Sequence, residues 1–174
     1  FTVAQSNPST LATDIIVTLD LGTVEATDIN SVVTYIDAAG NPATTTVAIL
    51  QTGLALSIPA TPDGSTPWSP VFTITATQDA IYEVSEALTM NLALAAGETD
   101  ATLGNATATG TIFDEDSVTR SETDPAVGNE QGDKPVVSIT ATDAVAVEGT
   151  ANSTLVFTVA QSNPSTLATD IIVT

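Results

Sequence analysis

The chain has 174 residues, of which 21 are Asp or Glu and only 2 are Lys or Arg, so its formal net charge is −19. A surface this acidic repels nucleic acids and anionic membranes, and it attracts divalent cations. The sequence has no Cys, which excludes disulfides, and no His, which disfavours zinc sites and histidine-based catalysis.

The first 18 residues, FTVAQSNPSTLATDIIVT, recur without change at Phe157–Thr174. The offset of 156 residues is the size of a whole domain, so we expect a tandem array of domains. The chain then holds the parts of one repeat in permuted order, cut inside the repeat at both ends. We expect residues 1–116 to be the body of a repeat without its first strands, 117–134 to be an acidic linker, and 135–174 to be the first strands of the next repeat.

Short stretches in which apolar and polar residues alternate predict strands throughout the chain. We expect Val47–Leu50 and Leu54–Ile58 to form a hairpin, and the loop Pro59–Pro70 holds the only Trp, Trp68. No helical period of useful length is present, so the pattern predicts an all-β, antiparallel two-sheet sandwich. In chain order the predicted strands are Ile15–Leu21, Val47–Leu50, Leu54–Ile58, Val71–Thr77, Leu88–Leu94, Ala106–Phe113, Val137–Ile139, Val145–Val147 and Leu155–Val159.

Four acidic features lie at expected strand ends or in loops. Loops between alternate strands of a sandwich gather at one end of the domain, so these carboxylates are expected to converge. Converging carboxylates repel one another unless they are protonated or bind a cation. Ca²⁺ suits such an array better than Mg²⁺, because it accepts six to eight oxygen ligands in flexible geometry. Alternatively, acidic loop residues simply keep the protein soluble. The four features are Glu148 before Gly149, Asp28 after Gly22-Thr23, the group Asp79, Glu83 and Glu86, and the run Asp114, Glu115 and Asp116.

These motifs, in this order, resemble the Calx-beta domain. The matching stretches are Val147-Glu148-Gly149, Gly22–Asp28, Asp79–Glu86 and Gly110–Asp116, so the resemblance spans nearly the whole repeat. It implies an immunoglobulin-like sandwich that binds calcium at the end where the chain leaves the domain. The ligands that it implies are Asp28, Asp79, Glu83, Glu86, Asp114, Asp116 and Glu148, with Glu115 as a further ligand and Ile81 contributing its main-chain carbonyl.

Near-identical, acidic, Cys-free repeats also resemble the extender regions of giant bacterial RTX adhesins. We therefore expect a calcium-stiffened spacer, not an enzyme, in a secreted or surface-attached protein, with neighbouring repeats head to tail as its partners. We expect no nucleic-acid binding and no membrane insertion, because no apolar run approaches the roughly 18 residues of a membrane span. In separate copies of this chain, strand exchange would bring Glu148 to the calcium site of a neighbour.

Two other functions remain open at this point. One is a binding module for a carbohydrate, ice or a host protein, which would use Thr-rich strands or stack a ligand on Trp68; the indole would equally well cap the core. The other is a glycosidase with paired carboxylates. The second is disfavoured, because the acids lie at strand ends and no His, Cys or activated Lys assists them.

Overall fold

The computed structural model describes residues 1–79, 81–113, 135–151 and 153–174. The chain divides into two compact units, which we describe separately. The first unit comprises Phe1–Thr77 and Glu86–Ile112, and the second comprises Gln78–Ser85 and Phe113–Thr174. Within the described residues, no helix has the length and apolar character needed to cross a membrane.

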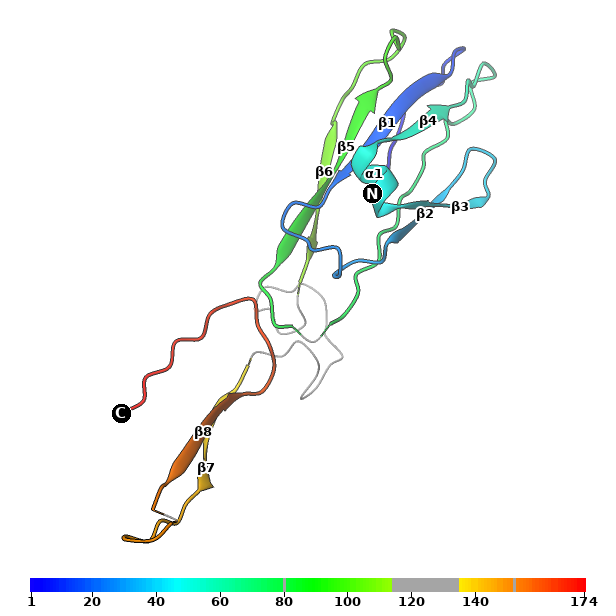
Figure 1. The fold of residues 1–174 in the computed structure, drawn as a ribbon. Coiled ribbons are helices and arrows are strands. Elements are labelled where there is room, and N and C mark those ends of the chain that lie inside the picture. Colours follow the sequence, from blue (N-terminus) through cyan, green and yellow to red (C-terminus); the bar gives the residue numbers. More distant parts are fainter. Residues whose placement is uncertain (80, 114–134, 152) are drawn as a thin grey trace. The chain divides into compact units, whose positions relative to one another are not determined.

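A four-stranded antiparallel sheet forms one layer of the first unit, in the order β4-β1-β5-β6 (Figure 1). The central strand β1 places Val17 opposite Leu54 of β4 and Leu92 of β5. These strands confirm the alternation seen in the sequence, with their ends shifted by one or two residues. Their bounds are β1 Thr13–Asp20, β4 Leu54–Ile58, β5 Glu86–Leu94 and β6 Thr107–Ile112.

A second set of extended segments centres on an antiparallel hairpin that the sequence pattern did not predict. Its strands are β2 (Val32–Ile36) and β3 (Pro42–Thr46). The predicted strand Val71–Thr77 runs beside β2 but is joined to its neighbours by isolated bridges rather than a continuous ladder. One of these bridges pairs Thr34 with Thr73, whose main chains exchange hydrogen bonds of 3.2 and 2.9 Å.

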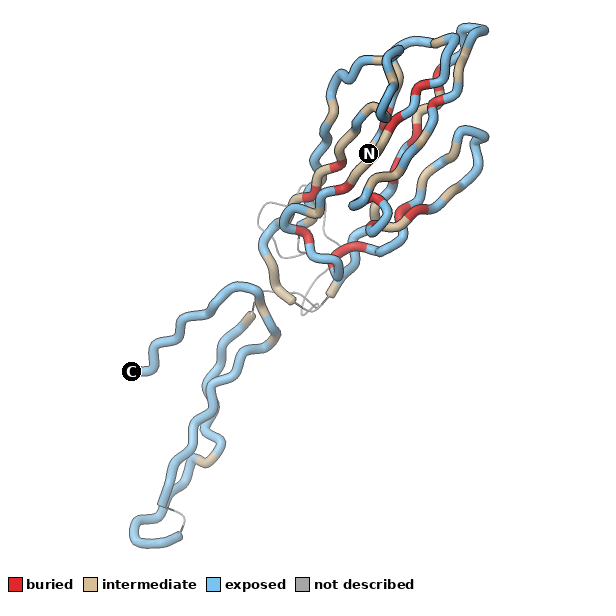
Figure 2. Tube along the Cα trace, turned by 45° about the horizontal axis from the view of Figure 1, so that its top comes forward, coloured by how far each residue is buried: buried red, intermediate tan, exposed pale blue. Residues whose placement is uncertain are grey.

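The core of the first unit draws buried side chains from both sets of strands (Figure 2). Val17 of β1 and Val33 of β2 are fully buried, and Phe72 is 1% exposed. Tyr35 stacks on Phe72 with ring centroids 5.3 Å apart. Burying such aromatic and branched side chains is the main favourable term in the stability of a domain of this size. The described structure is therefore mainly antiparallel β, as predicted.

The predicted strand Val47–Leu50 is wrong, because this segment is the helix α1 (Val47–Thr52). The Thr46 hydroxyl caps the helix by accepting a hydrogen bond of 3.2 Å from the Ile49 amide. Gly53 ends it with φ 113° and donates its N–H to the Ile49 carbonyl. Caps at both ends thus favour a short helix. Strand β4 follows and pairs with β1 instead of closing the expected hairpin.

The described strands of the second unit form a hairpin of β7 (Val137–Asp143) and β8 (Val156–Gln161). The register shifts between Ala141 and Asp143, which marks a bulge. The predicted strand Val145–Val147 is wrong: the chain after Asp143 is a loop, and Gly149 turns it with φ 77°. No described residue of this unit is buried, so the hairpin exposes both of its faces (Figure 2). The predicted linker 117–134 lies outside the described residues.

Candidate metal centre

Asp28 lies at the end of a tight loop that holds its carboxylate in place. The side chain is only 5% exposed. Its Oδ2 accepts a hydrogen bond of 2.6 Å from the Glu25 amide, and the Thr27 hydroxyl donates to Oδ1 at 3.3 Å. The Asp28 carbonyl accepts from the Thr77 amide at 2.7 Å. A carboxylate that is both buried and fixed in this way is unusual unless it is paired or binds a cation.

Gly22 and Thr23 attach this loop to the first residues of β5. The Thr23 amide donates to the Ala87 carbonyl at 3.2 Å, and the Ala87 amide donates to the Thr23 hydroxyl at 2.9 Å. Gly22 has φ 59°, and a Cβ at that position would lie 2.4 Å from the Ala87 carbonyl oxygen. Only glycine permits this approach. The Gly-Thr pair of the sequence motif therefore sets the distance from the Asp28 loop to Glu86.

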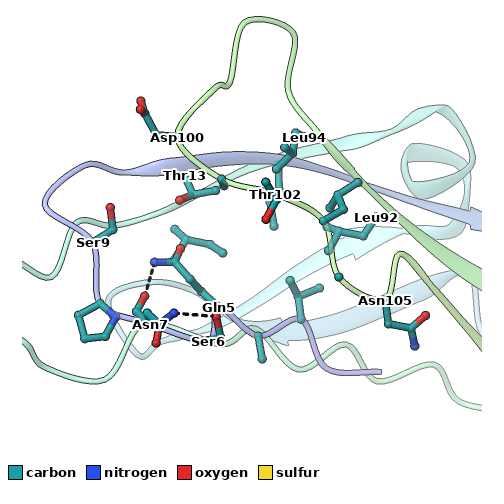
Figure 3. A pocket seen from close by; sticks show the side chains of 18 residues that line it. Gln5, Ser6, Asn7, Ser9, Thr13, Leu92, Leu94, Asp100, Thr102 and Asn105 are labelled. Carbon is teal, nitrogen blue, oxygen red and sulfur yellow. Dashed lines mark hydrogen bonds between the residues drawn. The ribbon is translucent and has the colours of Figure 1, made fainter.

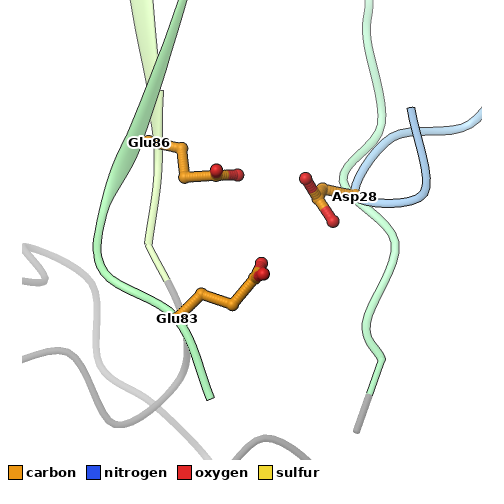
Figure 4. A group of neighbouring side chains, drawn as sticks. All are labelled: Asp28, Glu83 and Glu86. Atoms are coloured by element: carbon orange, nitrogen blue, oxygen red, sulfur yellow. The ribbon is translucent and has the colours of Figure 1, made fainter. Parts of the chain in front are cut away.

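Carboxylate oxygens of Asp28, Glu83 and Glu86 lie within 4.8 Å of one another. Figure 4 shows the three side chains directed toward a common point. Asp28 and Glu86 both belong to the first unit, and Glu83 comes three residues before Glu86. Both glutamates are half-buried. The three acids could hold a metal ion.

The donor set fits a hard cation. Three carboxylates at such short separation repel one another strongly when all are ionised, and a divalent cation removes this repulsion. Carboxylate oxygens are the ligands that Ca²⁺ and Mg²⁺ take in proteins, whereas structural zinc sites use Cys and His, which this chain lacks. A bound ion would contribute charge neutralisation and would join the Asp28 loop to the start of β5.

Other predicted ligands are placed differently. Asp79 is half-buried, and its Oδ1 accepts a hydrogen bond of 2.8 Å from the Ile81 amide. Glu148 lies in an exposed turn of the second unit, and β7 ends at Asp143, so Glu148 does not close a strand as predicted. Neither Asp79 nor Glu148 is among the three acids described above. Asp114, Glu115 and Asp116 lie outside the described residues; Ile112, two residues before Asp114, pairs with Glu86.

The side chain of Trp68 is held against the core of the first unit. Its indole Nε1 donates to the Ile36 carbonyl at 3.1 Å, and its ring packs against the core. A half-buried indole with its N–H satisfied caps the domain. Sequence reasoning did not identify the roles of the Glu25 amide and the Thr27 hydroxyl, which fix Asp28, since hydrogen bonds within a loop leave no periodic signal.

No protein-family model, curated protein or solved structure matches the chain. The function must therefore be inferred from the residues and their arrangement.

Proposed function

We propose that the chain is a unit of a calcium-binding structural spacer, built from tandem repeats. The observation that carries this proposal is the cluster of Asp28, Glu83 and Glu86, in which a buried carboxylate is held toward two others. The resemblance of the surrounding motifs to the Calx-beta domain supports calcium as the ion and an immunoglobulin-like sandwich as the complete fold. In that arrangement Asp114, Glu115 and Asp116 would supply further oxygens.

The second unit supports the spacer role through a contact that involves two successive repeats. The Tyr82 amide donates to the Pro164 carbonyl at 3.1 Å, and the Thr166 amide donates to the Tyr82 carbonyl at 3.2 Å. Tyr82 precedes β5 of one repeat, whereas residues 164–166 belong to the second copy of the repeated block. In the proposed tandem array, these hydrogen bonds would join the loop that carries Glu83 to the following repeat. An ion bound at Glu83 would stiffen this junction and align consecutive domains.

The expected affinity for Ca²⁺ indicates that the protein works outside the cell. Extracellular modules bind Ca²⁺ with dissociation constants of about 10⁻⁴–10⁻³ M, which fills their sites outside cells and leaves them empty in a cytosol. A string of such repeats is flexible before export and stiff afterwards. This behaviour suits the extender region of a secreted or surface-attached bacterial adhesin, in which rigid length, rather than chemistry on a substrate, is the function.

Calcium titration of two double variants tests the proposal. Asp28→Asn with Glu86→Gln removes two charges at the cluster, whereas Asp37→Asn with Glu98→Gln removes two charges elsewhere. Glu98 is a suitable control because hydrogen bonds from the Asp14 and Asp100 amides hold its pKa below the ordinary value, so it is ionised at neutral pH. We expect isothermal titration to lose at least one site in the first variant and none in the second. Equal losses would place the binding in the general acidic surface.

A further inference from the structure

The repeated block contains a turn, Asn-Pro-Ser-Thr, that has the same local structure in both copies. It comprises residues 7–10 in the first copy and 163–166 in the second, and we call it the NPST turn. In each copy the side chain of a preceding Gln donates a hydrogen bond to the Asn carbonyl, at 2.8 Å from Gln5 (Figure 3) and at 2.7 Å from Gln161. The turn is thus shaped by its own residues, and both copies present the same main-chain groups.

The first copy of the turn is held by its own unit through a single residue. The Thr61 amide donates to the Ser9 carbonyl at 2.7 Å, and the Ser9 amide donates to the Thr61 hydroxyl at 3.2 Å. Both residues belong to the first unit. The N–H and C=O of one residue in an extended segment point to the same side. These two groups therefore define one edge of the turn, which we call the Ser edge.

The second copy is held by a different loop through the residues on either side of the Ser. The Tyr82 amide donates to the Pro164 carbonyl at 3.1 Å, and the Thr166 amide donates to the Tyr82 carbonyl at 3.2 Å. The Ser165 hydroxyl also donates to the Tyr82 carbonyl, at 3.1 Å. Tyr82 and Ser165 form a parallel bridge within the second unit. We call this side of the turn the Pro–Thr edge.

The two edges point in opposite directions, because the main-chain groups of successive residues in an extended segment alternate in direction. In the first copy Pro8 and Thr10 are exposed, whereas Ser9 is half-buried. Contact with Thr61 through the Ser edge uses none of the main-chain atoms with which the second copy contacts Tyr82. One turn can therefore make both contacts at once.

The two loops that hold these turns belong to one repeat, but the two turns do not. Residues 78–85 connect Thr77 to Glu86, which both belong to the first unit, so the Tyr82 loop is covalently part of the domain that contains Thr61. The turns are 156 residues apart. The Thr61 loop thus holds the turn of its own repeat, and the Tyr82 loop holds the turn of the next.

We propose that the NPST turn is a two-edged connector between consecutive repeats. Its Ser edge binds the Thr61 loop of its own domain while its Pro–Thr edge binds the Tyr82 loop of the preceding domain. The partner is a second repeat of the same sequence, recognised through main-chain hydrogen bonds and one Ser hydroxyl. This connector requires the tandem array of the proposed function, but it does not require the bound ion.

Disulfide formation within one chain tests the Pro–Thr edge, because the chain contains no Cys. Paired strands lie about 4.8 Å apart, within the Cα range of a disulfide. The double variant Tyr82→Cys with Ser165→Cys is oxidised at low protein concentration, and its free thiols are counted by alkylation and mass spectrometry. The matched control is Tyr82→Cys with Ser9→Cys, in which the same local sequence surrounds the second substitution but Thr61 holds the turn.

We expect most chains of the first variant to lose both thiols while remaining monomeric, and the control to keep both. The main chain of Tyr82 makes the contact, so replacement of its side chain leaves the contact in place. Equal disulfide formation in the two variants, or none in either, overturns the proposal.

Disulfide formation between two chains tests whether both edges are used at once. The acceptor chain carries Tyr82→Cys with Thr166→Pro, which removes the amide that donates to Tyr82 and so vacates the loop. The donor chain carries Ser9→Cys and keeps the main-chain bonds to Thr61. The control donor carries Ser9→Cys with Thr10→Pro, the equivalent change on its Pro–Thr edge. We expect a disulfide-linked heterodimer with the first donor and roughly tenfold less with the control donor, because a hydrogen-bond donor is lost.

Both mixtures are oxidised in calcium and in EDTA, so that the connector and the ion are judged separately. A heterodimer with the first donor in either condition supports the connector, even if titration detects no calcium binding. Its absence in both conditions, or equal amounts with the two donors, overturns the two-edged connector.

Discussion

At the scale of single residues, Gly22 controls the geometry of the candidate metal centre most directly. Its positive φ is accessible to glycine without cost, and its missing Cβ lets the Ala87 carbonyl approach. The loop that ends in Asp28 is tied to β5 at this point. A side chain here would have to displace main chain rather than a flexible side chain, so the loop and β5 would separate.

Gly22→Ala is therefore expected to destabilise the fold by about 1–3 kcal/mol and to weaken calcium binding together with stability. Gly64→Ala is the matched control, because Gly64 also has positive φ, at 77°, but a Cβ there meets nothing within 4 Å. Urea denaturation of the two variants separates the close approach from backbone strain alone. Equal losses of stability would show that the contact with Ala87 is unimportant.

The sequence singled out nine candidate ligands but not which of them converge. Among those that the structure describes, Asp28, Glu83 and Glu86 lie together. The alternation before Glu148 also suggested a strand end, but β7 bulges at Asp143 and the chain then enters an exposed turn. Which acids converge depends on tertiary contacts between distant segments, which local spacing does not contain.

At the scale of elements, the helix α1 depends on its caps more than on its length. Six residues form too few helical hydrogen bonds to be stable alone. The Thr46 hydroxyl supplies a partner for the Ile49 amide, and Val47 and Leu50, three residues apart, bury their side chains on one face. The helix thus exists because of its cap and its packing.

Thr46→Ala should lower the free energy of unfolding by about 1 kcal/mol, because the Ile49 amide loses its acceptor. Thr52→Ala, at the exposed other end of the same helix, should change it by less than about 0.5 kcal/mol. Thermal or urea denaturation measures both. A Thr46→Ala variant as stable as the Thr52→Ala variant would contradict the capping role.

The predicted strands are observed where the alternation in the sequence and the neighbouring strands of the sheet favour the same conformation. The strands β1 and β5 alternate clearly and lie at the centre of a sheet, so pattern and packing lead to the same structure. The sequence does not predict the hairpin of β2 and β3, since its second strand, Pro42–Thr46, is mostly Thr and shows no apolar alternation. The apolar run Val47–Leu50 predicts a strand, because a helix of six residues is too short to show a helical period.

The repeated block shows how far local sequence determines structure. In both copies the Leu amide, at Leu11 and at Leu167, donates to a Ser hydroxyl two residues earlier. Yet Val17 is fully buried in β1, whereas its equivalent Val173 is 73% exposed and lies in no strand. Turns are therefore local properties of this sequence, and strands require a partner.

At the scale of the whole molecule, the dominant property is the large negative net charge. A net charge of −19 on 174 residues opposes compaction through self-repulsion. Any salt reduces this repulsion by screening, and a specific site adds a further effect that depends on the identity of the cation. Calcium must therefore be compared with another divalent cation at equal ionic strength, and not only with its own removal.

The most direct test of the calcium-binding proposal is the melting temperature of the chain, measured by circular dichroism. The chain is melted in calcium, in magnesium at equal concentration, and in EDTA. One site at free calcium about 100-fold above its Kd adds about 2.7 kcal/mol, which for a domain of this size raises the melting temperature by roughly 5–10 °C. We predict a shift of at least this size in calcium, a much smaller one in magnesium, and its loss in Asp28→Asn with Glu86→Gln. Identical melting curves in calcium, magnesium and EDTA would contradict the calcium-binding spacer.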